Sequence, residues 1–161
     1  MTGQLRWILL VVAGAVAFAS GAWLLLKPPS GPLPVFADAG DRDLVALGAD
    51  IYAAQCASCH GNALEGQPNW RERGLDGKLP APPHDATGHT WHHDDATLFG
   101  LTKYGPAGFS GTDYASDMPA YENVLSDREI LAVLAYIKST WPSAVRERQA
   151  LISAQSAGGR S

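Results

Sequence analysis

Cys56 and Cys59 are the two cysteines of the chain, and they stand three positions apart with His60 directly after the second. Two thiols at this spacing followed by histidine are typical of the attachment site of c-type haem. The thiols add across the two vinyl groups of the porphyrin, and the histidine lies under the iron as an axial ligand. The sequence therefore predicts one covalent haem c held by Cys56 and Cys59, with His60 on the iron.

Other uses of a cysteine pair fit this sequence less well. A thioredoxin-like redox pair would need a βαβ setting, whereas the residues before Cys56 show helical spacing. A zinc site would need two further ligands, and the chain has no second cysteine pair. Haem attachment is the interpretation that uses all three residues.

The second axial ligand is sought by elimination. The methionines are Met1, which precedes a long apolar segment, and Met118, so Met118 is the thioether expected on the iron. Pro119 removes one backbone donor and restrains the chain beside it. Core packing is the ordinary role of a lone methionine. The rival ligands are four histidines: His84, His89, His92 and His93.

These four histidines also raise the question of a second metal, because imidazole and carboxylate ligands together suit copper or zinc. The neighbouring carboxylates are Asp85, Asp94 and Asp95. The same residues could instead cap a helix and bind backbone, so the sequence leaves a second metal open. Partly buried haem propionates need hydrogen-bond donors, and the candidates are Trp70, Arg71, Arg73 and Trp91.

An uncharged segment of twenty residues occupies positions 7–26. As a helix rising about 1.5 Å per residue it would extend about 30 Å, the thickness of a bilayer's hydrocarbon core. Ala17-Phe18-Ala19 fits a signal-cleavage pattern, but the apolar part of a signal usually ends after about 7–15 residues. We therefore expect an uncleaved transmembrane anchor at 7–26, with residues 1–6 in the cytoplasm.

The chain after this segment divides by composition into a linker, a domain and a tail. Residues 27–40 contain four prolines and two glycines, which indicates an extended linker. The length that remains suits one domain, expected at 41–142 and followed by a C-terminal tail at 143–161. After position 26 the chain has eleven Lys and Arg against sixteen Asp and Glu, so a phosphate backbone would not attract it.

Helical signals dominate the domain. Leu44, Leu47 and Ile51 follow three-and-four spacing and predict a helix over about 41–57. Ser126 and Glu129 form a capping box, which predicts a second helix over about 126–142. A shorter helix is expected from Asp94 or Asp95 to about Lys103, and no strand pair is evident. The predicted class is all-α, with a bound group at the centre because three helices alone close a core poorly.

These motifs together resemble class I c-type cytochromes in the membrane-anchored monohaem form found in bacteria. The resemblance covers about 48–141 and is carried by Gly48, Tyr52, the Cys56–His60 motif, Met118-Pro119 and Leu134–Lys138. It implies three to five helices wrapped around one covalent haem, preceded here by one transmembrane helix.

The resemblance also assigns roles to single residues. The first and last helices of the family cross closely at a glycine, which would be Gly48, packing with Tyr52 against Val133, Tyr136 and Ile137. A proline carbonyl accepts a hydrogen bond from the iron-binding histidine. Pro82 resembles that proline, with Pro68 as the alternative, and the stretch 67–79 is longer than in compact members.

The expected location and role follow from the same family. Bacteria attach haem through thioethers outside the cytoplasm, which places the haem domain in the periplasm, anchored in the inner membrane by a single pass. Two axial ligands leave the iron no free position, so the expected activity is one-electron transfer and not catalysis. The expected partners are respiratory or dehydrogenase complexes and membrane lipid, without nucleic acid or a small-molecule substrate. The alternatives are a fixed haem relay subunit of a larger membrane oxidoreductase and a haem-based sensor with an exchangeable sixth ligand.

Overall fold

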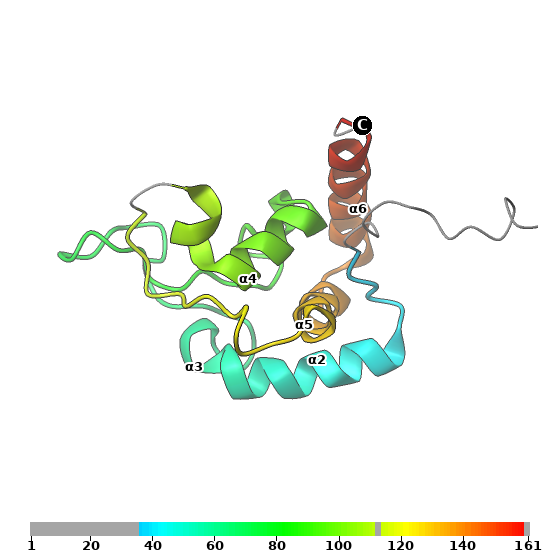
Figure 1. Ribbon diagram of the computed structural model, residues 1–161, viewed down its shortest axis with the longest axis horizontal. Helices are drawn as coiled ribbons and strands as arrows, with labels where there is room; N and C mark the ends of the chain where they lie inside the picture. Colours follow the sequence, from blue (N-terminus) through cyan, green and yellow to red (C-terminus); the bar gives the residue numbers. More distant parts are fainter. Residues whose placement is uncertain (1–35, 112–113, 160–161) are drawn as a thin grey trace, which may run out of the picture. The chain divides into compact units, whose positions relative to one another are not determined.

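The structure, a computed structural model, describes residues 36–111 and 114–159 (Figure 1). Within these ranges the regular elements are helices, and no strand is present. They are α2 (Arg42–Gln55), α3 (Ala57–His60), the 3-10 helix η1 (Thr90–His92), α4 (Asp95–Ser110), α5 (Asp127–Ser139) and α6 (Ser143–Gly158). The all-α class expected for the domain is confirmed.

Local capping explains where the two long predicted helices begin. The side chain of Asp41 accepts hydrogen bonds from the backbone N–H groups of Asp43 and Leu44 and so starts α2. At α5 the Ser126 hydroxyl accepts from the Glu129 N–H, and the Glu129 carboxylate accepts from the Ser126 N–H. The helices predicted at 41–57 and 126–142 are therefore confirmed, with α5 ending at Ser139.

The crossing of α2 and α5 organises the domain. In Figure 1, α2 lies across the view and α5 is seen almost along its axis, directly above α2. A Cβ atom at Gly48 would lie 1.9 Å from the carbonyl oxygen of Ala132 and 2.9 Å from Cβ of Tyr136. No side chain fits in that space, so the glycine allows the two backbones to touch. The expected role of Gly48 at the helix crossing is confirmed.

Helix α4 continues past its expected end. It begins at the cap Asp94, whose carboxylate accepts from the Thr97 N–H, and it extends to Ser110 where the sequence predicted about Lys103. The helix bends at Gly105, which has φ 70° and ψ 161°, directly before Pro106. The predicted end at about Lys103 was therefore too early, because the chain bends at Gly105 and then resumes its helix.

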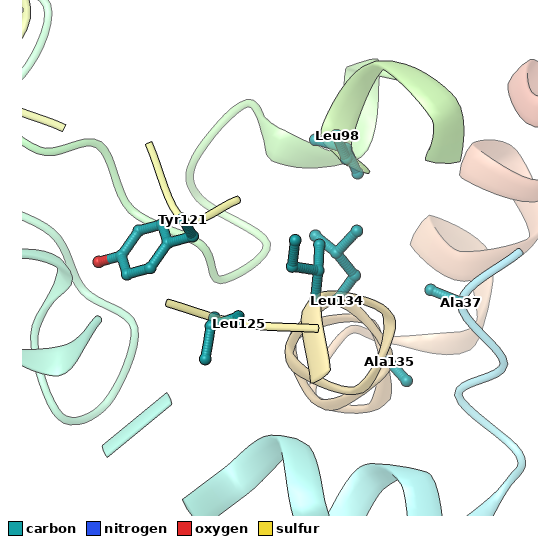
Figure 2. Close-up of a cluster of buried hydrophobic side chains, with 7 residues drawn as sticks. Ala37, Leu98, Tyr121, Leu125, Leu134 and Ala135 are labelled. Atoms are coloured by element: carbon teal, nitrogen blue, oxygen red, sulfur yellow. The ribbon is translucent and has the colours of Figure 1, made fainter. Parts of the chain in front are cut away.

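Two groups of buried apolar side chains pack on either side of α5. The first joins α4, α5 and the chain before α2. Figure 2 shows Leu134 and Ala135 on α5, with Leu98 above them, Ala37 on one side and Tyr121 and Leu125 on the other. The second lies between α2, α5 and the segment after α3, and its buried members are Tyr52, Ala57, Leu64, Val133, Ile137 and Trp141. The second group includes Ala57 of the Cys56–His60 segment, and Cys56 packs against it.

Helix α6 occupies the region expected as a tail, and it is fastened to the domain by a buried polar network. Lys138 Nζ lies 2.9 and 2.8 Å from the two carboxylate oxygens of Asp95, and Gln149 Nε2 donates to Asp95 Oδ1 at 2.6 Å. The N–H of Ala37 donates to the same carboxylate at 3.0 Å. The network thus joins α4, α5, α6 and the chain that enters the domain. The sequence predicted a separate C-terminal tail at 143–161, whereas these buried contacts join the helix to the domain.

Within 36–111 and 114–159, no helix has the length and apolarity needed to span a membrane. The predicted anchor at 7–26 and most of the predicted linker at 27–40 lie outside the described residues.

Candidate haem site

The Cys56–His60 motif lies at the junction of α2 and α3. Cys56 is the C-cap of α2, and its N–H donates to the Tyr52 carbonyl oxygen at 2.9 Å. Helix α3 begins at the next residue. The Tyr52 hydroxyl donates to the carbonyl oxygen of Gly61 at 3.0 Å, which closes the turn after His60. Tyr52 of α2 therefore holds both ends of the motif, through its backbone carbonyl at Cys56 and through its hydroxyl after His60.

Both thiols are free in the described structure. Cys59 is exposed and Cys56 is half-buried, and burial, with a smaller effect of Cys59, raises the pKa of the Cys56 thiol to about 11. A thioredoxin-like pair needs a lowered thiol pKa, because the thiolate is the reactive form. The raised pKa of Cys56 therefore disfavours a dithiol redox role for this residue.

The ring of His60 is buried and its orientation is fixed by one hydrogen bond. Nδ1 of His60 lies 2.8 Å from the carbonyl oxygen of Pro82. A carbonyl oxygen only accepts, so Nδ1 carries the proton and Nε2 keeps a free lone pair. Burial lowers the pKa of His60, against a smaller opposing effect of the Pro82 bond, so the ring is neutral at neutral pH. A neutral imidazole whose second nitrogen donates to a carbonyl is the usual form of a metal-binding histidine.

The Pro82 carbonyl reaches His60 because a glycine lies behind it. Gly66 has φ 68°, and a Cβ there would lie 2.6 Å from the Pro82 carbonyl carbon and 2.4 Å from the Pro83 nitrogen. The Gly66 N–H also donates to the His60 carbonyl oxygen at 2.8 Å. The resemblance assigned this position to Pro82, and the alternative, Pro68, is exposed.

Met118 lies half-buried in the chain between α4 and α5. Its N–H donates to the Ser116 hydroxyl at 3.1 Å, and the Met118–Ala120 backbone packs against Gly105 at the bend of α4. The bend of α4 at Gly105 thus supports the methionine loop.

Tyr121 connects the methionine loop to the cysteine motif. Its N–H donates to the carbonyl oxygens of Thr102 and Lys103 on α4, at 3.2 and 3.0 Å. Its hydroxyl donates to the Gln55 carbonyl oxygen at 2.8 Å, one residue before Cys56. Burial and the nearby thiols raise the pKa of Tyr121. Tyr121 was not among the residues predicted for the site, although it closely follows Met118 and Pro119.

The residues proposed for the propionates lie in different surroundings. Trp70 stacks on His89, with ring centroids 5.3 Å apart, and the guanidinium of Arg71 lies 3.9 Å from the centre of the Trp70 ring. Arg73 donates to the Gly77 carbonyl oxygen at 2.6 Å. Trp91 packs against the buried group that contains Trp141, and its indole N–H donates to the carbonyl oxygen of Ala86 at 3.3 Å. The Trp91 donor is thus already engaged.

The four rival histidines do not converge on a metal site. No group of three or more His, Cys, Asp or Glu side chains suited to a metal occurs in the part of the chain that the structure describes. His92 stacks on Trp91, His93 approaches His89 edge to face, and His84 stacks on His60. Asp94 and Asp95 serve as helix cap and ion-pair partner. The carboxylates and imidazoles therefore have structural contacts of their own.

An all-helical domain with two free thiols and a neutral, hydrogen-bonded histidine has the donor set of a c-type haem protein. A sequence profile described as "Cytochrome c" matches residues 45–141, and the chain belongs to this family. Its members carry covalently attached haem c and transfer electrons, and the residues described above suit that group. Haem c, when bound, supplies an iron that takes up and releases one electron.

One curated relative indicates the kind of assembly in which a similar domain occurs. The chain is 32% identical over 99 residues to the protein named "Cbb3-type cytochrome c oxidase subunit CcoP" from Azospirillum sp. (strain B510). The match covers 62% of this chain but 29% of that protein, so the chain spans less than a third of the relative's length. No solved structure matched the chain.

Proposed function

We propose that this protein is a membrane-tethered carrier of single electrons, with one haem c bound to Cys56 and Cys59 and the iron held between His60 and Met118. The arrangement of His60 carries the proposal. Its Nδ1–H donates to the Pro82 carbonyl oxygen and its pKa is lowered, so Nε2 has a free lone pair that can bind iron. This tautomer is the one that metal-binding histidines use. His60 also directly follows the two free cysteines of the haem-attachment motif.

The two ligands determine the kind of chemistry. With an imidazole and a thioether both bound, the iron has no open coordination position, which favours electron transfer over oxygen or peroxide chemistry. A thioether also favours the reduced iron and so raises the potential relative to a site with two histidines. Arg71 and Trp70 are proposed to bind the propionates, since they lie together and both carry N–H donors.

Location is part of the same proposal. Residues 7–26 anchor the chain in the bacterial inner membrane, and the proline-rich residues 27–40 hold the haem domain in the periplasm. The net charge of about −5 after position 26 suits partners with basic or apolar docking surfaces. The tether supplies a high effective concentration near membrane complexes, so long-range steering is not needed. Only a modest dependence of transfer rate on salt is expected.

Optical spectra test the covalent and axial bonds separately. Acidified organic solvent should leave the pigment on the denatured wild type, and Cys56→Ser and Cys59→Ser should each lose one thioether, seen as a red shift of the reduced α band. Met118→His should lose the weak far-red sulfur-to-iron band and acquire a lower potential. An extractable pigment would refute haem c, and an unchanged Met118→His spectrum would remove this residue from the iron.

A second candidate is favoured by the similarity to a CcoP subunit. In this case the domain is a fixed relay within a larger membrane oxidoreductase. Gentle detergent extraction distinguishes the two candidates. Constant stoichiometry with an oxidase or dehydrogenase across purification steps supports the relay. A tethered carrier separates from its partners and, when excess chemical reductant re-reduces its haem after each transfer, reduces more than one equivalent of acceptor complex per haem.

A further inference from the structure

His84 lies face to face with the ring of His60. The two ring centroids are 4.0 Å apart and the planes are inclined by 23°. Tyr52 approaches His84 edge on, with centroids 6.4 Å apart. From sequence, His84 was a rival axial ligand or part of a second metal site. Its position against the flat face of another imidazole suits a different role.

The backbone of His84 is held from two directions. Its N–H donates to the Leu64 carbonyl oxygen at 2.8 Å, and its own carbonyl oxygen accepts from the indole N–H of Trp141 at 2.7 Å. Leu64 and Trp141 are both buried, 5% and 1% exposed. His84 therefore lies on a fixed segment, and the same segment presents the Pro82 carbonyl to His60.

The ring of His84 is fixed as well. Its Nδ1 lies 2.9 Å from the hydroxyl oxygen of Thr90, a side chain that is 5% exposed. That hydroxyl donates its single proton to the Pro83 carbonyl oxygen at 3.4 Å. Thr90 must then accept from Nδ1 of His84, which sets both the tautomer and the rotation of the ring.

We infer that His84 is a positioning residue for the iron-binding histidine: its ring, locked by Thr90, covers one face of His60 and keeps the Nδ1–H of His60 on the Pro82 carbonyl. The inference rests on the proposed function, in which His60 binds the iron. A hydrogen bond in the ring plane and a stacked ring on its face restrict different rotations of the imidazole. Together they hold Nε2 in one direction and exclude water from the Nδ1–H bond.

The test measures the Nδ1 proton of His60 in the haem-loaded oxidised protein. Proximity to the iron shifts the His60 ring signals out of the crowded NMR region, and exchange of the Nδ1–H with D2O reports its protection. We expect His84→Ala to accelerate this exchange at least tenfold, equivalent to about 1.4 kcal/mol. His84→Phe keeps a stacked ring but loses the bond to Thr90, so its exchange should be faster than in the wild type and clearly slower than in His84→Ala.

Two further variants complete the design. Thr90→Val frees the His84 ring without removing it and should give an intermediate acceleration, which keeps the test informative if His84→Ala does not fold. His92→Ala is the matched control, because His92 is an exposed histidine of the same segment that stacks on Trp91 at 3.7 Å and not on His60. It should leave the exchange unchanged.

The outcomes separate this inference from the proposed function. Unchanged exchange in His84→Ala, or a His84→Phe protein as fast as His84→Ala, would overturn the positioning role of the ring face. Loss of the low-spin spectrum in both His84 variants would make His84 a ligand and overturn it also. Absence of iron-shifted His60 signals in the wild type would instead refute the ligation of His60, and with it the proposed function.

Discussion

Replacing Gly48 by alanine tests the helix crossing that supports the whole site. The new Cβ would lie 1.9 Å from the Ala132 carbonyl oxygen, about 1.5 Å short of an ordinary contact of 3.4 Å. The obstructing atom belongs to the backbone of α5 and cannot rotate away. The helices must separate, at a cost near the upper end of the roughly 1–3 kcal/mol seen for overpacked cores. Alanine recovers about 1 kcal/mol through its higher helix propensity.

The net expectation for Gly48→Ala is a loss of about 2 kcal/mol in the free energy of unfolding, or roughly 8 °C in Tm for a domain of this size. Denaturant unfolding of the haem-loaded protein, followed by far-ultraviolet circular dichroism, measures it. Gly108→Ala is the matched control on α4, because its Cβ would meet Tyr104 Cβ at an ordinary 3.5 Å and should be neutral or stabilising. Equal stability of the two variants would refute the backbone contact as the reason for glycine.

Three further predictions concern the rest of the domain. Asp95→Asn leaves Lys138 as an unpaired buried charge and should cost about 3 kcal/mol in denaturant unfolding, with partial recovery when Lys138→Met is added; an additive double variant would contradict this. Asp117→Asn breaks an exposed ion pair with Lys78 beside the methionine loop, and such pairs contribute little to stability. The imidazole concentration that displaces Met118 and removes half of the far-red band should therefore change by less than about fivefold, and loss of the band without imidazole would contradict this. Burial lowers the pKa of His93, so the unfolded chain takes up the proton first as pH falls below about 6.5, and stability decreases in that range; His93→Gln should lose less stability between pH 7 and 5, and an identical pH profile would be evidence against the shift.

The sequence predicted α2 and α5 well because their signals are local. A cap at Asp41, a capping box at Ser126 and apolar residues at helical spacing each act within a few positions. The predicted end of α4 was too early, since the helix bends at Gly105 against the methionine loop and then continues, and no local pattern shows that contact. The place of α6 in the domain was not predicted, because its main anchor is a buried glutamine, Gln149, whose partners His93 and Asp95 lie far earlier in the chain.

The candidate site divides in the same way. The spacing of Cys56, Cys59 and His60 predicts haem attachment without any structure, because the chemistry needs those groups on one turn of chain. The environment of the histidine depends on residues more than twenty positions away, and only the fold brings them to it. Family resemblance indicated the Pro82 carbonyl, but nothing in the sequence distinguished His84 from the other histidines.

The sequence by itself determined the cofactor chemistry, the helical class and the ends of the main helices, because these depend on neighbouring residues. Tertiary structure alone decided that the C-terminal helix belongs to the domain, that Tyr121 links the methionine loop to the cysteine motif, and that one histidine stacks on another. The physical reason is that stacking, burial and long-range hydrogen bonds depend on how helices pack. That packing is specified by the apolar faces and small residues of the whole chain and is not written in the spacing of any single motif.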